Sequence, residues 1–276
     1  MKTIHCFFSG GRDSAVVCYV AYQVTRVRGW NFRLVHIDTT IGLEETEEYV
    51  KYYAEWLGVE LVVLRPDLTF EEYAAKYPYW PHIYPPRMRW CYYKLKLRPT
   101  ERYLKQHYSA GDLIAMGVRG DESEPRRRRY TGVFMEKYYE GARVNAKLWL
   151  PLFYADDETI ERLLTKYKIP RSPVWDVVGM SGECFCLAGA TEKATARAVR
   201  TFPKLRIRLM KIDDIIHANR SRSSEESYPI FLKDKKIRLK KWLQNVCNSP
   251  TILDYLDDYR VGIRYTGKSC QGSCML

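Results

Sequence analysis

Five short apolar runs alternate with longer amphipathic stretches through the first two-thirds of the chain. The expected strands are residues 4–8, 32–38, 59–64, 113–118 and 147–152. The expected helices are residues 15–28, residues 44–57, a stretch from Cys91 or Lys94 to His107, and a stretch from Asp156 or Asp157 to Tyr167. Strands that alternate with helices predict an α/β fold with a doubly wound parallel sheet. Ligands of such sheets bind at the carboxyl ends of the strands.

The last third of the chain has a different character. Residues 197–241 contain 14 Lys or Arg side chains and 5 Asp or Glu side chains, and their helical stretches break around Asn219 to Pro229. We therefore expect an α/β domain over residues 1–195 and a basic, mainly helical region with a cysteine-containing tail over residues 196–276. Proline and aromatic residues between Tyr77 and Arg89 predict a loop.

A glycine turn joins the first expected strand to the first expected helix. It consists of Ser9, Gly10, Gly11, Arg12, Asp13 and Ser14. Adjacent glycines adopt conformations closed to other residues, so backbone amides can surround an anion. The positive end of the helix that opens with Asp13 and Ser14 faces the same anion. The turn therefore predicts a phosphate-binding loop, and the alternative is a plain strand-to-helix connection.

These six residues resemble the SGGxDS loop of the PP-loop ATP pyrophosphatases. That superfamily includes phosphoadenosine phosphosulfate (PAPS) reductases, tRNA and DNA thiolation enzymes and nucleotide-activating amidotransferases. The turn is not a Walker A loop, because no Gly-Lys-Ser/Thr follows, and it lacks the three-glycine spacing of a Rossmann loop. The resemblance implies that residues 1–195 form a nucleotide-binding domain, that Ser9 to Ser14 hold ATP, PAPS or adenylyl sulfate, and that Asp13 is also catalytic.

Four further segments resemble the PAPS reductase-like branch of this superfamily. Residues 36–46 contain an Asp-Thr pair and a Glu-Thr pair, and residues 89–99 begin with Arg-Trp-Cys. Residues 117–126 match the pattern G-x-R-x-x-E-S-x-x-R, and residues 150–186 end in Cys-x-Cys. In the first segment Thr40 and Ile41 displace the family's usual glycine, which reappears as Gly42. Five segments in register cover residues 4 to about 190 and indicate the family, but they do not select one reaction.

Two arginines and one acid are candidates for contact with the nucleotide. Arg119 and Arg126 can grip a phosphate or sulfate with a bidentate guanidinium fork, or they can belong to a solvated basic surface beside Arg127. We favour the site for Arg119, where it also has a catalytic role, and leave Arg126 open. Asp38 follows the second expected strand and can hold Mg²⁺ or a ribose hydroxyl; the alternative is an N-cap for the next helix.

Three cysteines suggest a metal centre. Cys184 and Cys186 flank one residue in a glycine-containing loop, and Cys91 lies where relatives carry an iron–sulfur ligand. Thiolates of this kind bind an iron–sulfur cluster or zinc. Adenylyl-sulfate reductases supply four cysteines, whereas Trp90 stands here in place of one of them. The set resembles the open three-cysteine [4Fe-4S] site of some thiolation enzymes, and the alternative is three small buried residues.

The tail carries two further cysteines, Cys270 and Cys274. PAPS reductases attack the sulfonyl group with a tail cysteine in an E-C-G-L/I-H motif, but here no glutamate precedes Cys270 and no glycine or histidine follows in the motif's positions. A thiolate from the tail is expected as nucleophile or fourth metal ligand, and the alternative is an unstructured terminus. Cys6 and Cys18 fall in an expected strand and helix, where core packing explains them.

Composition narrows the partners. The chain has 276 residues and a formal net charge of +12, which favours a nucleotide, a nucleic acid or an acidic protein as partner. No apolar run reaches the roughly 20 residues that span a membrane, and no leader precedes the first strand, so we expect a cytoplasmic protein. In that reducing compartment, eight cysteines favour metal or redox chemistry over disulfides.

Three functions remain open at this stage. The first is ATP-dependent adenylation and thiolation of an acceptor such as tRNA or DNA, held by the basic region with Tyr228, Phe231 and Trp242, and served by a thiol or sulfur donor. The second is a PAPS or adenylyl-sulfate reductase that releases sulfite. The third is a non-enzymatic nucleotide-binding subunit of a nucleic-acid complex. The sequence leaves the oligomeric state undetermined.

Overall fold

The computed structural model describes residues 1–81, 89–120, 124–188, 190–219, 228–229, 232, 235 and 237–248. The chain forms two compact units. The first unit comprises Met1–Phe70 and Arg87–Phe185, and the second comprises Glu71–Pro86 and Cys186–Leu276. The domain boundary near residue 195 stays a prediction.

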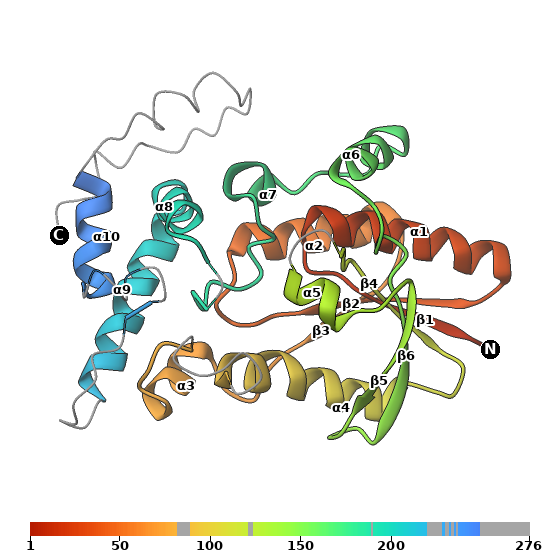
Figure 1. Cartoon of the computed structure of the whole chain (residues 1–276), viewed down its shortest axis with the longest axis horizontal. Coiled ribbons are helices and arrows are strands. Elements are labelled where there is room, and N and C mark those ends of the chain that lie inside the picture. The colour runs from red at the N-terminus through yellow and green to blue at the C-terminus, as the bar shows by residue number, and fades with distance from the viewer. Residues whose placement is uncertain are drawn as a thin grey trace. The chain divides into compact units, whose positions relative to one another are not determined.

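A six-stranded sheet is the centre of the first unit (Figure 1). Its strands follow the order β3 (Leu61–Leu64), β2 (Asn31–Ile37), β1 (Thr3–Phe7), β4 (Leu113–Met116), β6 (Val144–Trp149) and β5 (Phe134–Tyr139). All neighbours are parallel except β5 and β6, which are antiparallel. The predicted α/β fold with a parallel sheet is therefore confirmed.

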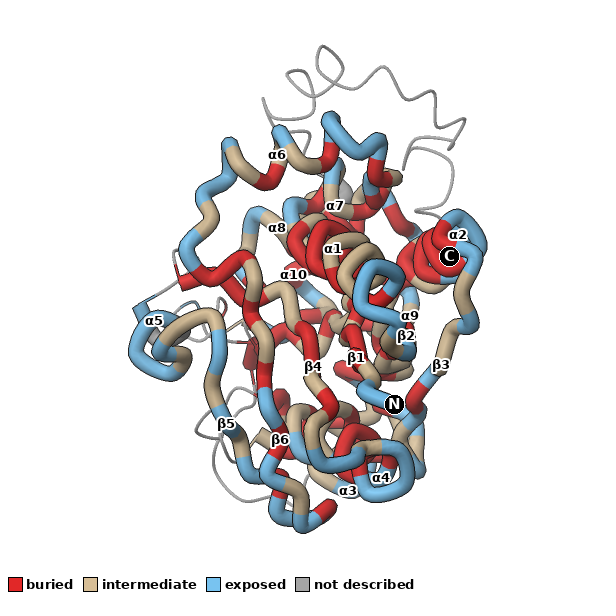
Figure 2. Tube along the Cα trace, turned by 90° about the vertical axis from the view of Figure 1, so that its right-hand side faces the viewer, coloured by how far each residue is buried: buried red, intermediate tan, exposed pale blue. Residues whose placement is uncertain are grey.

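Helices cover both faces of this sheet. One face packs against α1 (Arg12–Arg28), α2 (Glu44–Leu57) and α6 (Asp157–Lys166), and the other packs against α4 (Arg98–His107). Three shorter elements complete the unit: the π-helix η2 (Tyr92–Leu97), α5 (Glu124–Arg129) and α7 (Pro173–Val178). Figure 2 shows buried positions concentrated along β1, β4 and α1, while the outer strand β5 carries exposed positions.

Helix ends follow the signals in the sequence. Gly58 ends α2 in the left-handed conformation with φ +68°, as a C-terminal glycine does. The side chain of Asp156 accepts a hydrogen bond from the amide of Thr159 and so caps α6, one of the two starts expected for that helix.

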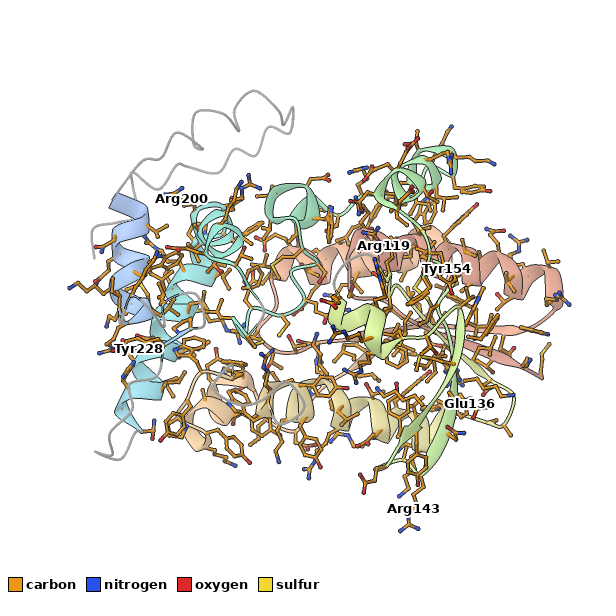
Figure 3. The ribbon with its side chains drawn as sticks, in the orientation of Figure 1. Arg119, Glu136, Arg143, Tyr154, Arg200 and Tyr228 are labelled. Atoms are coloured by element: carbon orange, nitrogen blue, oxygen red, sulfur yellow. A yellow bond between two sulfur atoms is a disulfide. The ribbon has the colours of Figure 1, made fainter. Side chains whose placement is uncertain are left out.

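The strands β5 and β6 form a hairpin that the sequence analysis did not predict. The sequence pattern predicts a strand at residues 147–152 and no strand between that one and the strand at 113–118. The hairpin runs from Phe134 to Trp149, with Glu136 and Arg143 on it (Figure 3). Along β5 the side chains alternate between exposed and more buried positions, a pattern typical of a strand with one solvated face.

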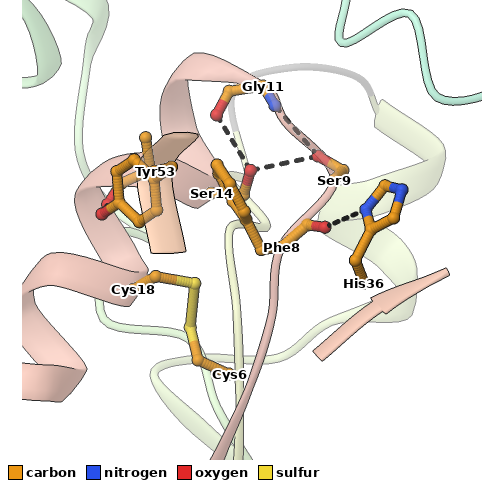
Figure 4. Close-up of a disulfide and its surroundings, with 9 residues drawn as sticks. Cys6, Phe8, Ser9, Gly11, Ser14, Cys18, His36 and Tyr53 are labelled. Atoms are coloured by element: carbon orange, nitrogen blue, oxygen red, sulfur yellow. Dashed lines mark hydrogen bonds between the residues drawn. A yellow bond between two sulfur atoms is a disulfide. The ribbon is translucent and has the colours of Figure 1, made fainter. Parts of the chain in front are cut away.

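A disulfide joins β1 to α1. Cys6 and Cys18 are fully buried and bonded, with their Cα atoms 5.6 Å apart (Figure 4). The expected position in the core is therefore confirmed, and the bond between the two cysteines was not predicted. A parallel strand followed by its crossover helix brings the two Cα atoms within the distance that a disulfide needs.

The second unit is helical. It contains most of α3 (Phe70–Lys76) together with α8 (Glu192–Thr201), α9 (Pro203–Ala218) and α10 (Leu239–Asn248). The buried carboxylate of Asp213 accepts hydrogen bonds from Trp80 Nε1 at 3.2 Å and from the amide of Lys240 at 3.2 Å. It thereby ties α9 to the segment before η2 and to the start of α10. Among the described residues, no helix has both the length and the apolarity to cross a lipid bilayer.

Removing the disulfide tests its contribution to stability. The pair closes a loop with a sequence separation of 12, so the double variant Cys6→Ala/Cys18→Ala should lose about 3 kcal/mol of unfolding free energy relative to the oxidised protein. Guanidinium chloride titrations without reductant measure this difference. Alkylation of Cys6 and Cys18 in denaturant without reductant, detected by peptide mass spectrometry, would contradict the bond.

His5 gives the stability a pH dependence. Burial lowers the pKa of His5 below its usual 6.5, and Asp112 opposes this effect only in part. The unfolded chain therefore takes up this proton at higher pH than the folded chain, so the folded state loses stability as the pH falls below about 6.5. The variant His5→Gln should lose less unfolding free energy than the wild type between pH 7.5 and pH 5.5. Equal losses would refute this account.

Candidate functional site

The glycine turn presents open amides at the end of β1. Gly10 has φ +76°, and a Cβ there would lie 2.8 Å from the side chain of Thr46, so only glycine fits. The amide of Ala15 bonds to the Gly11 carbonyl at 3.0 Å. In the described part of the chain, the amides of Arg12, Asp13 and Ser14 have no acceptor. Three amides at a helix start are therefore available to an anion.

Serine hydroxyls and a histidine fix the shape of this turn. Ser14 Oγ donates to the carbonyl of Gly11 at 2.9 Å and lies 3.1 Å from Ser9 Oγ (Figure 4). His36 Nδ1 donates to the carbonyl of Phe8 at 2.8 Å. Because a carbonyl only accepts, this bond places a proton on Nδ1 of the buried His36. The turn is thus held by contacts that leave its amides open.

The backbone after β4 lies directly against the turn. A Cβ at Gly117 would lie 2.7 Å from the amide nitrogen and 2.8 Å from the Cα of Ser14. Only a glycine allows this approach, because backbone atoms cannot move aside as a flexible side chain can. Gly117 opens the G-x-R segment, so its place in the sequence matches its role in the fold.

A loop from Ser181 to Phe185 closes over the ends of β1 and β2. The carbonyl of Gly182 accepts from the amide of Leu43 at 2.9 Å, and the amide of Phe185 donates to the carbonyl of Ile41 at 3.1 Å. A Cβ at Gly42 would lie 2.8 Å from the carbonyl oxygen of Glu183. The displaced glycine of the family pattern is therefore used here for close packing. Lys96 of η2 forms an ion pair with Glu183.

Arg12, Asp13, Arg119 and Asp157 form a closed ring of ion pairs. Asp13 accepts from Arg12 Nε at 3.2 Å and from Arg119 Nε at 2.8 Å. Asp157 Oδ1 accepts from Arg119 Nη2 at 2.7 Å and also from Arg12 Nη2. Arg119 is 6% exposed. Arg119, which follows β4, therefore lies beside the glycine turn and pairs with two carboxylates there.

Neighbouring charges extend this ring. Arg12 Nη1 donates to Glu161 Oε1 at 3.0 Å, and Arg171 donates to the other oxygen of Glu161. The hydrogen bond from Arg12 lowers the pKa of Asp157, and the hydrogen bond from Arg171 lowers the pKa of Glu161. Both acids therefore stay ionised well into the acidic range, which keeps the arginines paired at neutral pH.

Asp38 lies at the end of β2 but is already engaged. Its Oδ1 accepts from the amide of Thr40 at 2.8 Å, and its Oδ2 accepts from Arg65 Nε at 3.0 Å. The N-cap of α2 is Leu43, so the alternative of an Asp38 cap for that helix is wrong. Its contact with Mg²⁺ or a ribose hydroxyl stays a prediction.

The predicted metal ligands are not gathered into a site. Cys91 is buried at the start of η2, whereas Cys184 and Cys186 are half-buried in the loop after α7. Throughout the described ranges, no three His, Cys, Asp or Glu side chains are placed to hold a metal ion.

Several predicted residues lie outside the described part of the chain. These are the side chain of Arg126 and residues Glu122, Phe231, Cys270 and Cys274. Tyr228 and Trp242, expected to contact nucleic acid, are 7% and 6% exposed. Both rings pack inside the second unit and leave little surface for contact with a nucleic acid, so the part of the expected acceptor site that rests on them is not supported.

Residues 3–178 match the phosphoadenosine phosphosulfate reductase domain. The chain belongs to this PAPS reductase family. Two relatives come from Methanocaldococcus jannaschii, and both are called uncharacterized proteins. MJ0066 is 26% identical over 207 residues, which are 74% of this chain and 40% of that protein, and MJ0973 is 34% identical over 104 residues, which are 38% and 23%. The chain thus spans less than half the length of these relatives.

Solved structures resemble this PAPS reductase family chain at low identity. The PAPS reductase of Candida auris in a phosphate complex has a TM-score of 0.47 and 16% identity, with 64% of this chain and 78% of that chain covered. The U34-tRNA thiolase NcsA of Methanococcus maripaludis, with its [4Fe-4S] cluster, has a TM-score of 0.44 and 14% identity, with 79% and 70% covered.

The acidic partners of Arg12 were not predicted from the sequence. Asp157 was expected only at the start of a helix, and Glu161 falls within that helix. No local pattern marks an acid that pairs with an arginine about 150 positions away. Gly117 carried a usable signal, since a glycine directly after an apolar strand indicates a close backbone approach.

Replacing Gly117 by alanine tests the close approach. Gly117→Ala forces a Cβ into the backbone of Ser14, so it should lower the unfolding free energy by about 2 kcal/mol and weaken pyrophosphate binding at least about 10-fold. Thermal unfolding and calorimetric titration measure the two effects.

The control variant is Gly58→Ala. It carries the cost of a left-handed alanine, about 1 kcal/mol, in open space at the end of α2. It should be destabilised without losing pyrophosphate affinity. Equal affinities for Gly117→Ala and Gly58→Ala would show that the turn does not hold the anion.

Proposed function

We propose that this chain binds an adenine nucleotide at the glycine turn and uses ATP to adenylate and then thiolate an acceptor. The observation that supports the proposal is the set of open amides on Arg12, Asp13 and Ser14 at the start of α1. Amides of this kind, at the positive end of a helix, suit the phosphates of a nucleotide.

The reaction divides into two displacements. A carbonyl oxygen of the acceptor attacks the α-phosphorus of ATP, and pyrophosphate leaves. A sulfur nucleophile then attacks the activated carbon, and AMP leaves with the oxygen. The open amides would stabilise the negative charge that develops on the phosphate oxygens during the first displacement. Asp13 accepts hydrogen bonds from Arg12 and Arg119 and so orients both arginines around the turn. This orientation is the catalytic role that we propose for Asp13.

The tail sequence favours thiolation over sulfonyl reduction. Cys270 lacks the glutamate, glycine and histidine of the E-C-G-L/I-H motif by which the reductases are recognised. Reduction of PAPS or adenylyl sulfate remains the second candidate, because the family match is to the reductase domain and the tail still offers Cys270 and Cys274 as nucleophiles.

Exposed basic residues support a nucleic-acid acceptor such as tRNA or DNA. In the second unit Lys193, Lys204, Lys211 and Lys241 are exposed. Phosphate contacts of lysine supply affinity without base specificity. Other basic residues there are matched internally: Arg208 pairs with Glu71 at 2.6 Å, and Lys235 pairs with Glu192 at 2.6 Å. Fewer basic side chains are therefore available to bind an acceptor than the count of Lys and Arg residues alone indicates.

A [4Fe-4S] cluster or zinc on Cys91, Cys184 and Cys186, and Mg²⁺ beside Asp38, remain part of the proposal. The thiolates of the three cysteines would hold iron or zinc, and the carboxylate of Asp38 would hold Mg²⁺. Iron, sulfide and zinc analysis of protein purified without oxygen decides the metal question separately from the nucleotide reaction.

Product identification tests the proposed function. Protein purified without oxygen is incubated separately with ATP, adenylyl sulfate and PAPS, each with bulk tRNA, genomic DNA or neither, and with sulfide as donor. We expect AMP and pyrophosphate from ATP, and a decrease of about 100-fold in Asp13→Asn. Glu158→Gln, which removes an exposed charge from α6, should retain the wild-type rate.

Two results would redirect the assignment. Sulfite released from PAPS or adenylyl sulfate, without AMP formation from ATP, would establish the second candidate. Nucleotide binding without turnover of any of the three compounds would favour the non-enzymatic nucleotide-binding subunit.

A further inference from the structure

Two buried guanidinium groups share one exposed carboxylate beside the glycine turn. The side chains of Arg12 and Arg119 are 12% and 7% exposed, whereas that of Asp157 is 72% exposed. Both arginines donate to the same oxygen, Asp157 Oδ1. Toward solvent, Asp157 is therefore the acid that both arginines share, while Arg12 alone also pairs with Glu161, whose side chain is 41% exposed.

The other partners of the two arginines are held in place. Asp13 is 6% exposed and bonds to both Nε atoms. Glu161 is held from a second side by Arg171, which also donates to Asp176 at 3.1 Å. Asp157 has no such second anchor within the described residues, and it begins α6 directly after the Asp156 cap. It is the member of the ring that can leave at the smallest cost.

We propose that Asp157 is an internal stand-in for a phosphate of the nucleotide. When the ligand binds, a phosphate oxygen replaces Asp157 Oδ1 between Arg12 Nη2 and Arg119 Nη2, and the carboxylate turns out into water. The proposal rests on the proposed function, because it assigns these arginines to the nucleotide site. The ligand class is a tetrahedral, multiply charged oxyanion, such as the pyrophosphate part of ATP.

Charge and geometry favour this exchange. Arginine pairs with phosphate through two parallel N–H donors as readily as with a carboxylate. A phosphate group with about two negative charges attracts the arginine pair more strongly than a single carboxylate does. Since the side chain of Asp157 is already 72% exposed, its carboxylate is readily hydrated when it leaves the arginines. The phosphate takes its place, so the arginines keep a counter-ion during the exchange.

The exchange also serves product release. Pyrophosphate bound to two buried arginines would leave slowly if its departure left both charges unpaired. The return of Asp157 compensates those charges as pyrophosphate departs. Competition from Asp157 therefore lowers the affinity of the chain for pyrophosphate and speeds its dissociation. This relation is expected whenever an internal group and a ligand compete for one site.

Charge-neutral replacement of Asp157 tests the proposal. The full chain and its variants Asp157→Asn and Glu158→Gln are titrated calorimetrically with inorganic pyrophosphate. Glu158 is the next residue of the same exposed first turn of α6, so its variant removes an equal charge from the same end of the helix. We expect Asp157→Asn to bind pyrophosphate about 10-fold more tightly than the wild type, and Glu158→Gln to differ by less than about 2-fold.

A second measurement separates competition from a structural role. Without ligand, Asp157→Asn should unfold at a lower temperature than the wild type, because two buried arginines lose an ionised partner. With saturating pyrophosphate its increase in unfolding temperature should exceed that of the wild type. A variant damaged only in its folding would lose stability in both conditions and gain no affinity.

The outcomes separate this proposal from the proposed function. Tighter pyrophosphate binding by Asp157→Asn without AMP formation from ATP supports the exchange and removes the adenylation. Equal or weaker pyrophosphate binding by Asp157→Asn overturns the exchange, whatever the activity. A crystal structure with pyrophosphate in which Asp157 still bonds to both arginines would overturn it as well.

Discussion

The contact on which the site depends is the approach of the β4 backbone to the first turn of α1. Parallel pairing of β1 with β4 places Phe7 opposite Met116, so the next residues of both strands leave the sheet side by side. Gly117 then lies against Ser14 with no side chain between the two backbones. This contact delivers Arg119, two residues later, to Asp13. A bulkier residue at position 117 would separate the two halves of the site.

Electrostatics follow from that placement. Burying two arginines is unfavourable unless carboxylates accompany them, and the ring of Asp13 and Asp157 supplies those partners from the start of α1 and the start of α6. One partner is fixed by burial and the other lies at the surface. The pair of guanidinium groups is therefore held in place by these carboxylates, which balance its positive charge locally.

Much of the fold could be predicted from local patterns. The spacing of apolar residues predicted α1, α2, α4 and the parallel strands. The glycine turn predicted a candidate anion site at the end of β1. The strand β5 was not predicted because Glu136 and Lys137 interrupt its apolar residues. The Cys6–Cys18 bond and the ion pairs of Asp157 depend on three-dimensional neighbours that no local pattern records. Tyr228 and Trp242 suggested a nucleic-acid surface because they lie in a basic stretch of sequence, but both are buried and pack in the core of the helical unit.

The sheet has two edges, and each is unsuited to further pairing. On one side β3 has only four residues. On the other side β5 is antiparallel to its neighbour and carries Glu136 and Lys137 near its middle. Short or charged outer strands discourage edge-to-edge aggregation between molecules. The charged residues of β5 that obscured its strand pattern in the sequence thus also disfavour pairing of this edge with the sheet of another molecule.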